Sequence, residues 1–597
     1  MGVFEEAIES LNLVARPQQI SLLEIARDTV NNGTQRFVQA GTGTGKSYVL
    51  LSVALESARE TGMPSVIVCP NNILLDQYMT KDVVSLGGVA PGKWAHIKGR
   101  NRYICANSLA TFTMDRDAAN KYYLKMIDRD ELEWAKLFVG EDWACPGSDL
   151  CNPTRLHGFE CNKKTIFKEK KKFDLEDSTA TEMIQISVCE CPFNCGAVEA
   201  KRKAADAEVV ITNAHVLVWD YLVGLFTDGQ AGLLPEYGAL FVDECHELEA
   251  IGRGCLSDEI SETSPMVSSI EGLARWVEER RVSLVDAGAS EAPLERSLAV
   301  MAMAEDAKRL IWDLKFVEDP TKTQQLQLRR LKKFVEFVGE SEDFVSIIDV
   351  QDPDKAKLRR VCVDAGSTFN RILTGQPTVL VSGTIPGSDR RRLGLPKEAR
   401  TQYVGHPFDY SKSTLIISRF NPTKSADRLG RVASAARAIN ETGGGTLVLF
   451  TSWKDAEIFM PMIAERLTPG IDVYLQSRED PATLADDIAD FSKDGNAVLA
   501  GVRSLFTGLD IPGPALRQVI LWKLPWPYPT IETQAIQDRF GRNTYKDMML
   551  TILVQGIGRL IRKTDDTGRV LILDSRAKKL DFNSNGMTHH LAEFGKA

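Results

Sequence analysis

The sequence lacks long apolar runs and has no excess of positive charge. Its net charge is −9, so an acidic partner such as nucleic acid would have to be recognised through local features. No uninterrupted apolar run reaches the roughly 18 residues that span a bilayer, and the most apolar stretch, 214–226, is broken by Asp220. The first residues have neither the basic nor the apolar region of a signal peptide. We therefore expect a cytoplasmic protein without membrane segments.

Cysteine is sparse except in one segment. Seven of the 11 cysteines lie between Cys105 and Cys195. A chain without an export signal is expected in a reducing compartment, where clustered cysteines favour a metal site over disulfides.

Short apolar runs alternate with helical patterns in two regions, which is typical of βα units and parallel sheets. The length of 597 residues exceeds what one core usually supports. The pattern predicts an α/β protein with two parallel-sheet domains, whose strands are expected at 36–40, 65–69, 209–212, 240–243 and 378–382, and at 446–451, 472–475, 497–500, 518–522 and 569–573. A charged segment near 256–365 has helical periodicity in 297–314 and 325–338.

The segment AGTGTGKS, residues 40–47, fits the P-loop pattern G-x-x-x-x-G-K-[ST], with Ala40 in place of the first glycine. A strand-like run precedes it and a helical pattern follows, as this motif requires. Its backbone N–H groups and the helix N-terminus would bind phosphate oxygens. Lys46 would reach the β- and γ-phosphates, and the Ser47 hydroxyl would ligate Mg²⁺. The candidate ATP-binding residues are Gly41, Thr42, Gly43, Thr44, Gly45, Lys46 and Ser47.

Two carboxylates follow a buried-strand pattern in LFVDECHE, residues 240–247. Asp243 is a candidate Mg²⁺ ligand, and Glu244 is a candidate general base for the attacking water. A solvated acidic loop would look similar, but the P-loop favours the catalytic interpretation.

A third motif is QGIGRLIR, residues 555–562, inside a helical pattern. Arg559 and Arg562 are three positions apart, so we expect them on one helical face, where guanidinium groups suit a γ-phosphate. Two exposed helix arginines would be the commoner explanation, but the segment also matches the helicase pattern Q-x-x-G-R-x-x-R, which includes Gln555.

Together these motifs resemble the XPD/DinG group of superfamily 2 helicases. DECH at 243–246 is similar to the DEAH box, with Cys245 in the third place. Further matches, in the family's order, are RPQQ (16–19), VSGTIP (381–386), LVLFTSW (447–453), SLFTGLDIPG (504–513) and KLPWPYP (523–529).

The resemblance implies an ATP-dependent DNA helicase that uses ATP and Mg²⁺, acts as a monomer on single-stranded and forked DNA, and moves 5′→3′. It implies a cytoplasmic or nucleoid-associated protein, with DNA repair among several possible pathways. The residues that it adds to the nucleotide site are Arg16, Gln19, His246, Gly508, Asp510 and Gln555.

The resemblance also implies two RecA-like motor domains, the first with two inserts. The expected parts are 1–95, 206–255 and 366–388 for motor domain 1, 96–205 for a cysteine-rich iron–sulfur insert, 256–365 for a helical arch insert, and 389–597 for motor domain 2.

The family's [4Fe–4S] cluster needs four thiolates. KGRNRYIC, ending at Cys105, and the segment after Cys195 resemble the family's ligand segments, although Gly196-Ala197 replaces the usual Pro-aromatic pair. Cys161 and Cys191 are chosen as the other two ligands, while Cys145, Cys151 and Cys189 stay open as alternatives. A zinc site would accept the same residue types, and a segment without metal is the third possibility.

Three other functions compete with a helicase. A DNA-stimulated ATPase that remodels complexes without separating strands would use the same motifs. A helicase–nuclease is disfavoured, because about forty residues precede the P-loop. A P-loop metabolic kinase would not need the second α/β domain or the arginine motif.

Overall fold

The computed structural model of the protein describes residues 2–41, 43–99, 196–226, 232–317, 321–480, 483–493, 495–506, 515–563, 565–582 and 588–596. By internal contacts the chain divides into two compact units, one of residues 1–36, 45–255 and 371–381, the other of residues 37–44, 256–370 and 382–597. Within the described ranges, each helix is too short or too polar to cross a bilayer.

The first sheet has seven strands in the order β11–β1–β10–β5–β2–β4–β3, with parallel pairing. In chain order the strands are β1 (Gln35–Ala40), β2 (Ser65–Cys69), β3 (Trp94–Ile97), β4 (Val209–Asn213), β5 (Ala239–Asp243), β10 (Thr378–Ser382) and β11 (Thr401–Gly405). Every residue of β2, β4, β5 and β10 is buried, because helices cover both faces of such a sheet. All five strands expected here are present, while β3 and β11 were not anticipated.

The helices of this region are α1 (Val3–Ser10), α2 (Pro17–Asn31), α3 (Lys46–Thr61), α4 (Asn72–Gln77), α5 (Val83–Gly87), α11 (Gly196–Ala205), α12 (Ala214–Phe226), α13 (Leu248–Leu256), α18 (Gly366–Thr374) and α19 (Asp389–Arg392). Two short elements matter for the site: the π-helical turn η1 (Tyr78–Asp82) and the 3₁₀ turn η4 (Cys245–Glu247).

The second sheet also has seven strands, in the order β14–β15–β13–β16–β17–β12–β18, all paired in parallel. The strands are β12 (Thr414–Ile417), β13 (Thr446–Leu449), β14 (Val473–Leu475), β15 (Val498–Gly501), β16 (Gln518–Leu521), β17 (Arg569–Ile572) and β18 (Gly595–Lys596). Its helices are α20 (Arg428–Thr442), α21 (Trp453–Ala464), α22 (Leu484–Lys493), α23 (Arg503–Phe506), α24 (Ile531–Phe540) and α25 (Arg542–Ile557), with 3₁₀ turns η5 (Tyr410–Lys412), η6 (Ser425–Asp427), η8 (Ser575–Lys579) and η9 (His589–Ala592).

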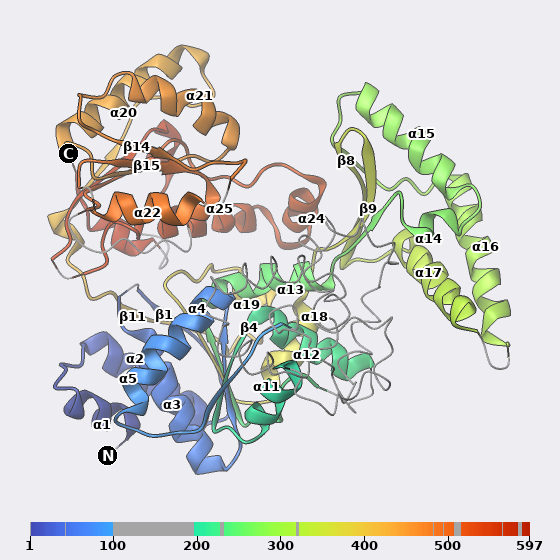
Figure 1. Ribbon diagram of the computed structural model, residues 1–597, viewed down its shortest axis with the longest axis horizontal. Coiled ribbons are helices and arrows are strands. Elements are labelled where there is room, and N and C mark those ends of the chain that lie inside the picture. The colour runs from blue at the N-terminus through green and yellow to red at the C-terminus, as the bar shows by residue number, and fades with distance from the viewer. Residues whose placement is uncertain are drawn as a thin grey trace, which may run out of the picture. The chain divides into compact units, whose positions relative to one another are not determined.

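Strand β13 shows why the strands of this sheet have continuous apolar sequences. Leu447 and Leu449 belong to the core that includes α25, and Val448 belongs to the core that includes α20 and α21. Successive residues point to opposite faces of a strand, so burial on both sides needs apolar residues throughout. Figure 1 shows α20 and α21 on one face of the sheet and α22 and α25 on the other.

The segment predicted as a helical arch is only partly helical. It contains a four-stranded antiparallel sheet, ordered β6–β9–β8–β7, which the sequence analysis missed. The strands are β6 (Asp258–Ser261), β7 (Glu291–Pro293), β8 (Phe344–Asp352) and β9 (Lys355–Cys362), and the helices are α14 (Pro265–Ser268), α15 (Leu273–Asp286), α16 (Leu298–Lys315) and α17 (Lys322–Val338).

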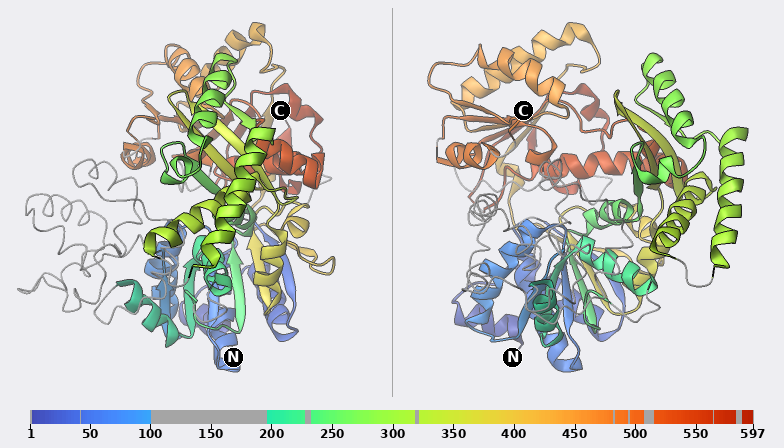
Figure 2. Two further views of the ribbon diagram at one scale, coloured as in Figure 1. Left: turned by 90° about the vertical axis from the view of Figure 1, so that its right-hand side faces the viewer. Right: turned by 45° about the vertical axis from the view of Figure 1, so that its right-hand side comes forward.

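The missed signal in this insert is a hairpin. Strands β8 and β9 pair across a turn at Pro353-Asp354, and Pro and Asp favour turns for local backbone reasons. One face of the sheet packs against α15, α16 and α17 in a single core, as Figure 2 shows. The two helices predicted at 297–314 and 325–338 correspond to α16 and α17.

Candidate active site

The P-loop connects β1 to α3 and is shaped by its glycines. Gly43 and Gly45 have φ angles of 72° and 75°, in the left-handed region that glycine adopts without a steric penalty. The Thr44 hydroxyl donates to the Gly41 carbonyl oxygen at 2.8 Å, which closes the loop on itself. Helix α3 begins at Lys46, so its free N–H groups face the loop, as phosphate binding requires.

Lys46 is buried and points toward the end of β5. Its Nζ lies 2.9 Å from Glu244 Oε1. Burial alone would lower the pKa of Lys46, but the negative charges of Glu244 and Asp243 outweigh it and raise this pKa. The lysine therefore stays positively charged, and an arriving phosphate would compete with Glu244 for it.

Asp243 and Glu244 form the acidic end of β5. Asp243 Oδ1 accepts the Glu244 backbone N–H at 2.9 Å. Burial, the largest effect, raises the pKa of Asp243 to about 6. Glu244 has a φ of 48°, and a left-handed backbone in a non-glycine residue costs about 1–2 kcal/mol. Such strain is typical of functional positions.

His246 lies beside the same carboxylate. Its ring is 4% exposed, with Nδ1 3.4 Å from Glu244 Oε2 and Nε2 3.7 Å from Glu247 Oε1. Burial acts to raise the pKa of Glu244, but Lys46 and His246 together hold it well below its ordinary range. Glu244 is therefore held as an ionised carboxylate while Lys46 contacts it.

Gln19 reaches the P-loop from the start of α2. Its Oε1 accepts the Arg16 backbone N–H at 2.9 Å in a capping box. The amide nitrogen Nε2 of Gln19 is consequently directed at Gly45, where a Cβ would collide with it. The structure thus brings Gln19 to the P-loop, and the Arg16 backbone orients it.

The arginine motif differs from the expectation. Helix α25 ends at Ile557, so Gln555 is helical, but Arg559 lies in the turn that follows and Arg562 in the irregular segment after it. The prediction that these arginines share a helical face is wrong. The reason is local: Gly556 and Gly558 have low helix propensity, and short-range bonds from Arg559 N to Gly556 O and from Leu560 N to Ile557 O tighten the end.

Two further residues at the carboxylate end of β5 were missed. The Tyr78 hydroxyl donates to Asp243 Oδ2 at 2.8 Å. Burial raises the pKa of Asp82, and the nearby Ser47 hydroxyl acts to lower it. Tyr78 and Asp82 both come from η1 and are buried. A usable sequence signal was the acidic Asp82 next to the apolar positions Val83 and Leu86.

Several predicted site residues lie outside the described residues. They are Thr42, Gly508, Asp510 and the four chosen cluster ligands Cys105, Cys161, Cys191 and Cys195. Among the described residues, His, Cys, Asp and Glu side chains do not form a group of three or more that could hold a metal ion.

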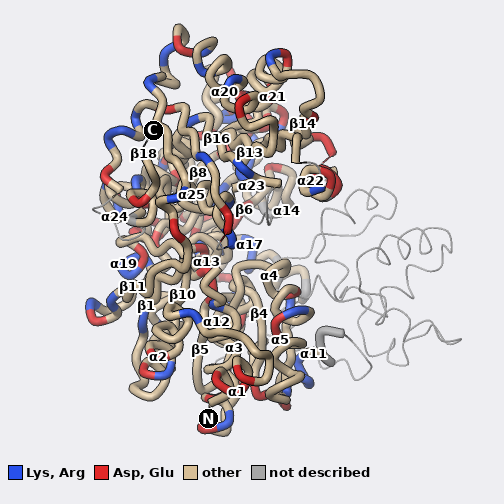
Figure 3. Tube along the Cα trace, turned by 90° about the vertical axis from the view of Figure 1, so that its left-hand side faces the viewer, with Lys and Arg blue, Asp and Glu red and all other residues tan. Residues whose placement is uncertain are grey.

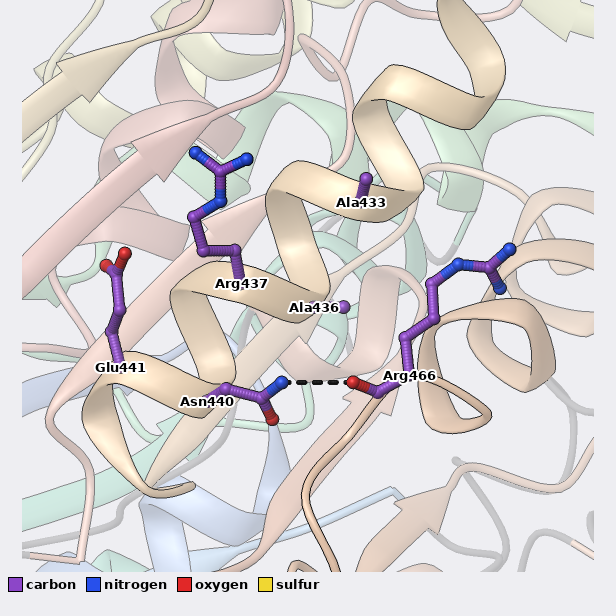
Figure 4. Close-up of a pocket in the computed structure, with 6 residues that line it drawn as sticks. All are labelled: Ala433, Ala436, Arg437, Asn440, Glu441 and Arg466. Atoms are coloured by element: carbon purple, nitrogen blue, oxygen red, sulfur yellow. Dashed lines mark hydrogen bonds between the residues drawn. The ribbon is translucent and has the colours of Figure 1, made fainter.

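A separate surface hollow lies on α20 and holds none of the predicted site residues (Figure 4). Asn440 Nδ2 donates to the Arg466 carbonyl oxygen there at 3.0 Å. The hollow is lined by Ala433, Ala436, Arg437, Asn440, Glu441 and Arg466. Figure 3 shows basic and acidic residues interspersed along the described chain.

Comparison with known proteins places these motifs in a family context. A model of the Helicase C-terminal domain matches residues 435–593. The ATP-dependent helicase DinG of Mycobacterium tuberculosis (strain ATCC 25618 / H37Rv) is 26% identical, over 96% of this chain and 92% of the relative. The ATP-dependent DNA helicase YoaA of Escherichia coli (strain K12) is 24% identical, over 94% of this chain and 91% of the relative.

Solved structures of XPD proteins have a similar fold. The structure described as XPD_Helicase has a TM-score of 0.59 at 13% identity, covering 98% of this chain and 99% of that chain. The structure of S. tokodaii Xpd4 has a TM-score of 0.56 at 13% identity, covering 98% and 100%. The predicted α/β class with two parallel-sheet domains and the resemblance to XPD/DinG-type helicases are therefore confirmed.

Proposed function

We propose that the chain is an XPD/DinG-like helicase of superfamily 2, which hydrolyses ATP to translocate along single-stranded DNA and separate duplex DNA. The observation that carries this proposal is the contact between the Lys46 ammonium and the Glu244 carboxylate at 2.9 Å. It joins the P-loop to the acidic end of β5, and both are required for phosphoryl transfer from ATP to water.

The chemistry assigns a role to each described residue. The ATP phosphates would draw Lys46 away from Glu244. The freed Glu244 carboxylate would accept a proton from the attacking water, whose oxygen bonds to the γ-phosphorus while the bond to the β-γ bridging oxygen breaks. ADP and inorganic phosphate are the products. Gln19, oriented by Arg16, would bind adenine, and His246 would link the state of Glu244 to the DNA path.

The donor set suits Mg²⁺, which prefers oxygen ligands and keeps several of its waters. The Ser47 hydroxyl and the Asp243 carboxylate would hold the ion, and it would neutralise negative charge on the phosphates. Both oxygens of Asp243 accept one hydrogen bond each, which leaves each a further lone pair.

Arg559, Arg562 and Gln555 would act on the γ-phosphate when the motor domains close around ATP, as arginine fingers do. Gly508 and Asp510 would couple this step to DNA. By family resemblance we propose a monomer that moves 5′→3′ on single-stranded and forked DNA. We further propose that residues 1–95, 206–255 and 366–388 form motor domain 1 and that residues 389–597 form motor domain 2.

The test is to purify the full chain anaerobically and measure ATP hydrolysis with and without single-stranded DNA, then strand displacement on forks with a 5′ or a 3′ tail. We expect stimulation by DNA and unwinding from the 5′ tail, both lost in Lys46→Ala and retained in the exposed-lysine control Lys203→Ala. Hydrolysis without DNA stimulation would overturn the helicase. Stimulation without strand displacement would leave a remodelling ATPase.

We also propose a [4Fe–4S] cluster held by Cys105, Cys161, Cys191 and Cys195. The support is seven cysteines within 105–195 of a chain in this family. Metal binding contributes directly to the folding of such a module, so the cluster would tie the ends of the insert together and let it act as a wedge at the fork.

Cys105→Ser should remove the brown chromophore and reduce unwinding more than basal ATP hydrolysis, because the nucleotide site lies in other segments. The measurements are the visible spectrum, iron and labile sulfide of anaerobically purified protein, with Cys255→Ser as a control outside the insert. A colourless wild type with zinc would favour the zinc site, and a wild type with neither metal would leave only the motor.

A further inference from the structure

The turn η1 interrupts the helical segment that follows β2. Its Val83 N–H bonds to the Tyr78 carbonyl oxygen, the i→i+5 spacing of a π-helix, which is rare and often found at functional sites. Tyr78 and Asp82 begin and end this turn, and both side chains are buried. A π-helical turn that buries two polar side chains calls for an explanation.

The Tyr78 hydroxyl fixes the Asp243 carboxylate. It donates to Oδ2 at 2.8 Å, while the Glu244 backbone N–H donates to Oδ1 at 2.9 Å. Each oxygen of Asp243 is therefore held by a separate donor, which sets the plane of the carboxylate. The Tyr78 side chain has no measurable exposure, so its packing leaves the hydroxyl little freedom to move.

Asp82 lies beside the other proposed Mg²⁺ ligand. Burial raises the pKa of Asp82 and the neighbouring Ser47 hydroxyl acts to lower it, and the residue is only 9% exposed. Its Oδ2 is buried and has no hydrogen-bond partner within the described part of the chain. Buried polar atoms without partners are uncommon, and an unused carboxylate oxygen suits a water that hydrated Mg²⁺ carries.

We infer that Tyr78 and Asp82 are positioning residues for Mg²⁺ at the ATP site: Tyr78 orients Asp243, and Asp82 places a buried carboxylate oxygen beside Ser47 for a water of the hydrated ion. This inference rests on the proposed ATPase. One turn then lies next to two ligands that come from different parts of the chain, the start of α3 and the end of β5. Mutation of a residue that hydrogen-bonds to a metal ligand typically lowers metal affinity by 10–100-fold.

The test uses Tyr78→Phe, which deletes one hydroxyl, and Asp82→Asn, which removes the charge at nearly constant size. Binding of a fluorescent ATP analogue is titrated with Mg²⁺ and separately in EDTA. For each variant we expect the Mg²⁺ concentration at half-maximal effect to rise about 10-fold or more, with affinity in EDTA unchanged. Tyr48→Phe is the matched control, because its hydroxyl pairs with Ser85 Oγ at 3.0 Å on the surface of the same unit.

A purely structural role predicts something else. The variants would lose thermal stability, while the folded fraction would show the wild-type Mg²⁺ dependence, and this result would overturn the inference. If Tyr78→Phe does not fold, Asp82→Asn decides alone. A wild type that hydrolyses ATP beside variants with unchanged Mg²⁺ dependence refutes only the positioning role, whereas a wild type without Mg²⁺-dependent nucleotide binding refutes the proposed function as well.

Discussion

The carboxylate side and the arginine side of the proposed ATP site are built in different ways. Lys46, Glu244, Asp243 and Tyr78 form one continuous series of contacts, with distances of 2.8–2.9 Å. The arginines lie beyond a helix end. Arg559 Nε donates to the Phe506 carbonyl oxygen at 3.1 Å.

The carboxylate side is therefore assembled before ATP binds, whereas the arginine side depends on the conformation of the segment after α25. Charged groups held in a buried network keep one geometry, which lowers the cost of reorganisation during the reaction. A turn after a helix can change conformation without disturbing the helix, which suits residues that engage only on domain closure. We therefore expect variants on the two sides to fail in different ways.

The largest effect is expected for Arg562→Ala. An arginine finger stabilises charge in the transition state and is worth about 10³–10⁵ in turnover. We expect kcat to fall within this range, with nucleotide affinity nearly unchanged, in steady-state and binding assays at saturating DNA. The exposed Arg437→Ala on α20 is the control. A parallel loss of nucleotide binding would show that Arg562 belongs to the preassembled side.

Glu244→Gln should reduce turnover by about 10²–10⁴-fold, the usual worth of a general base. The neutral amide also removes the charge that holds Lys46, so ATP should bind at least as tightly as in the wild type. Single-turnover hydrolysis and nucleotide retention measure the two effects, with Glu247→Gln as the neighbouring control. Normal hydrolysis in Glu244→Gln would place the general base elsewhere.

The sequence predicted the parts of this comparison that depend on local patterns. The strands β1, β5 and β10 and the loop before Lys46 follow from apolar runs and glycine spacing. Tyr78 was not predicted, because its importance arises only when η1 packs next to β5, whereas Asp82 had a weak local signal in the apolar positions that follow it. No local rule distinguishes Tyr78 from any other core tyrosine, so tertiary contacts were needed to find it.

The arginine side was predicted less well, for the same reason. The motif indicated Arg559 and Arg562, but the low helix propensity of Gly556 and Gly558 ends α25 at Ile557, before both arginines. The antiparallel sheet was missed because helical periodicity dominated its segment, although the Pro353-Asp354 turn and the alternation of Ala356 and Leu358 indicated a hairpin.

The smallest effect concerns Arg539, which joins α24 to the antiparallel-sheet insert within the arginine-bearing unit. Its guanidinium lies 2.8 Å from Asp364, 3.2 Å from Glu342 and 3.3 Å from Asp343, and its side chain is 36% exposed. Exposed ion pairs contribute at most about 1 kcal/mol, while the apolar contact of Phe540 and Val363 remains.

Arg539→Ala should therefore lower the melting temperature by a few degrees at most, with a loss that shrinks in high salt. Basal ATP hydrolysis should stay within about twofold of the wild type, because the ATP site does not use this contact. Thermal unfolding at low and high salt measures the first effect, with the exposed Arg542→Ala as control. A large drop in turnover for Arg539→Ala alone would instead show that the insert controls the turn that carries Arg562, and the arginine side would then include the insert.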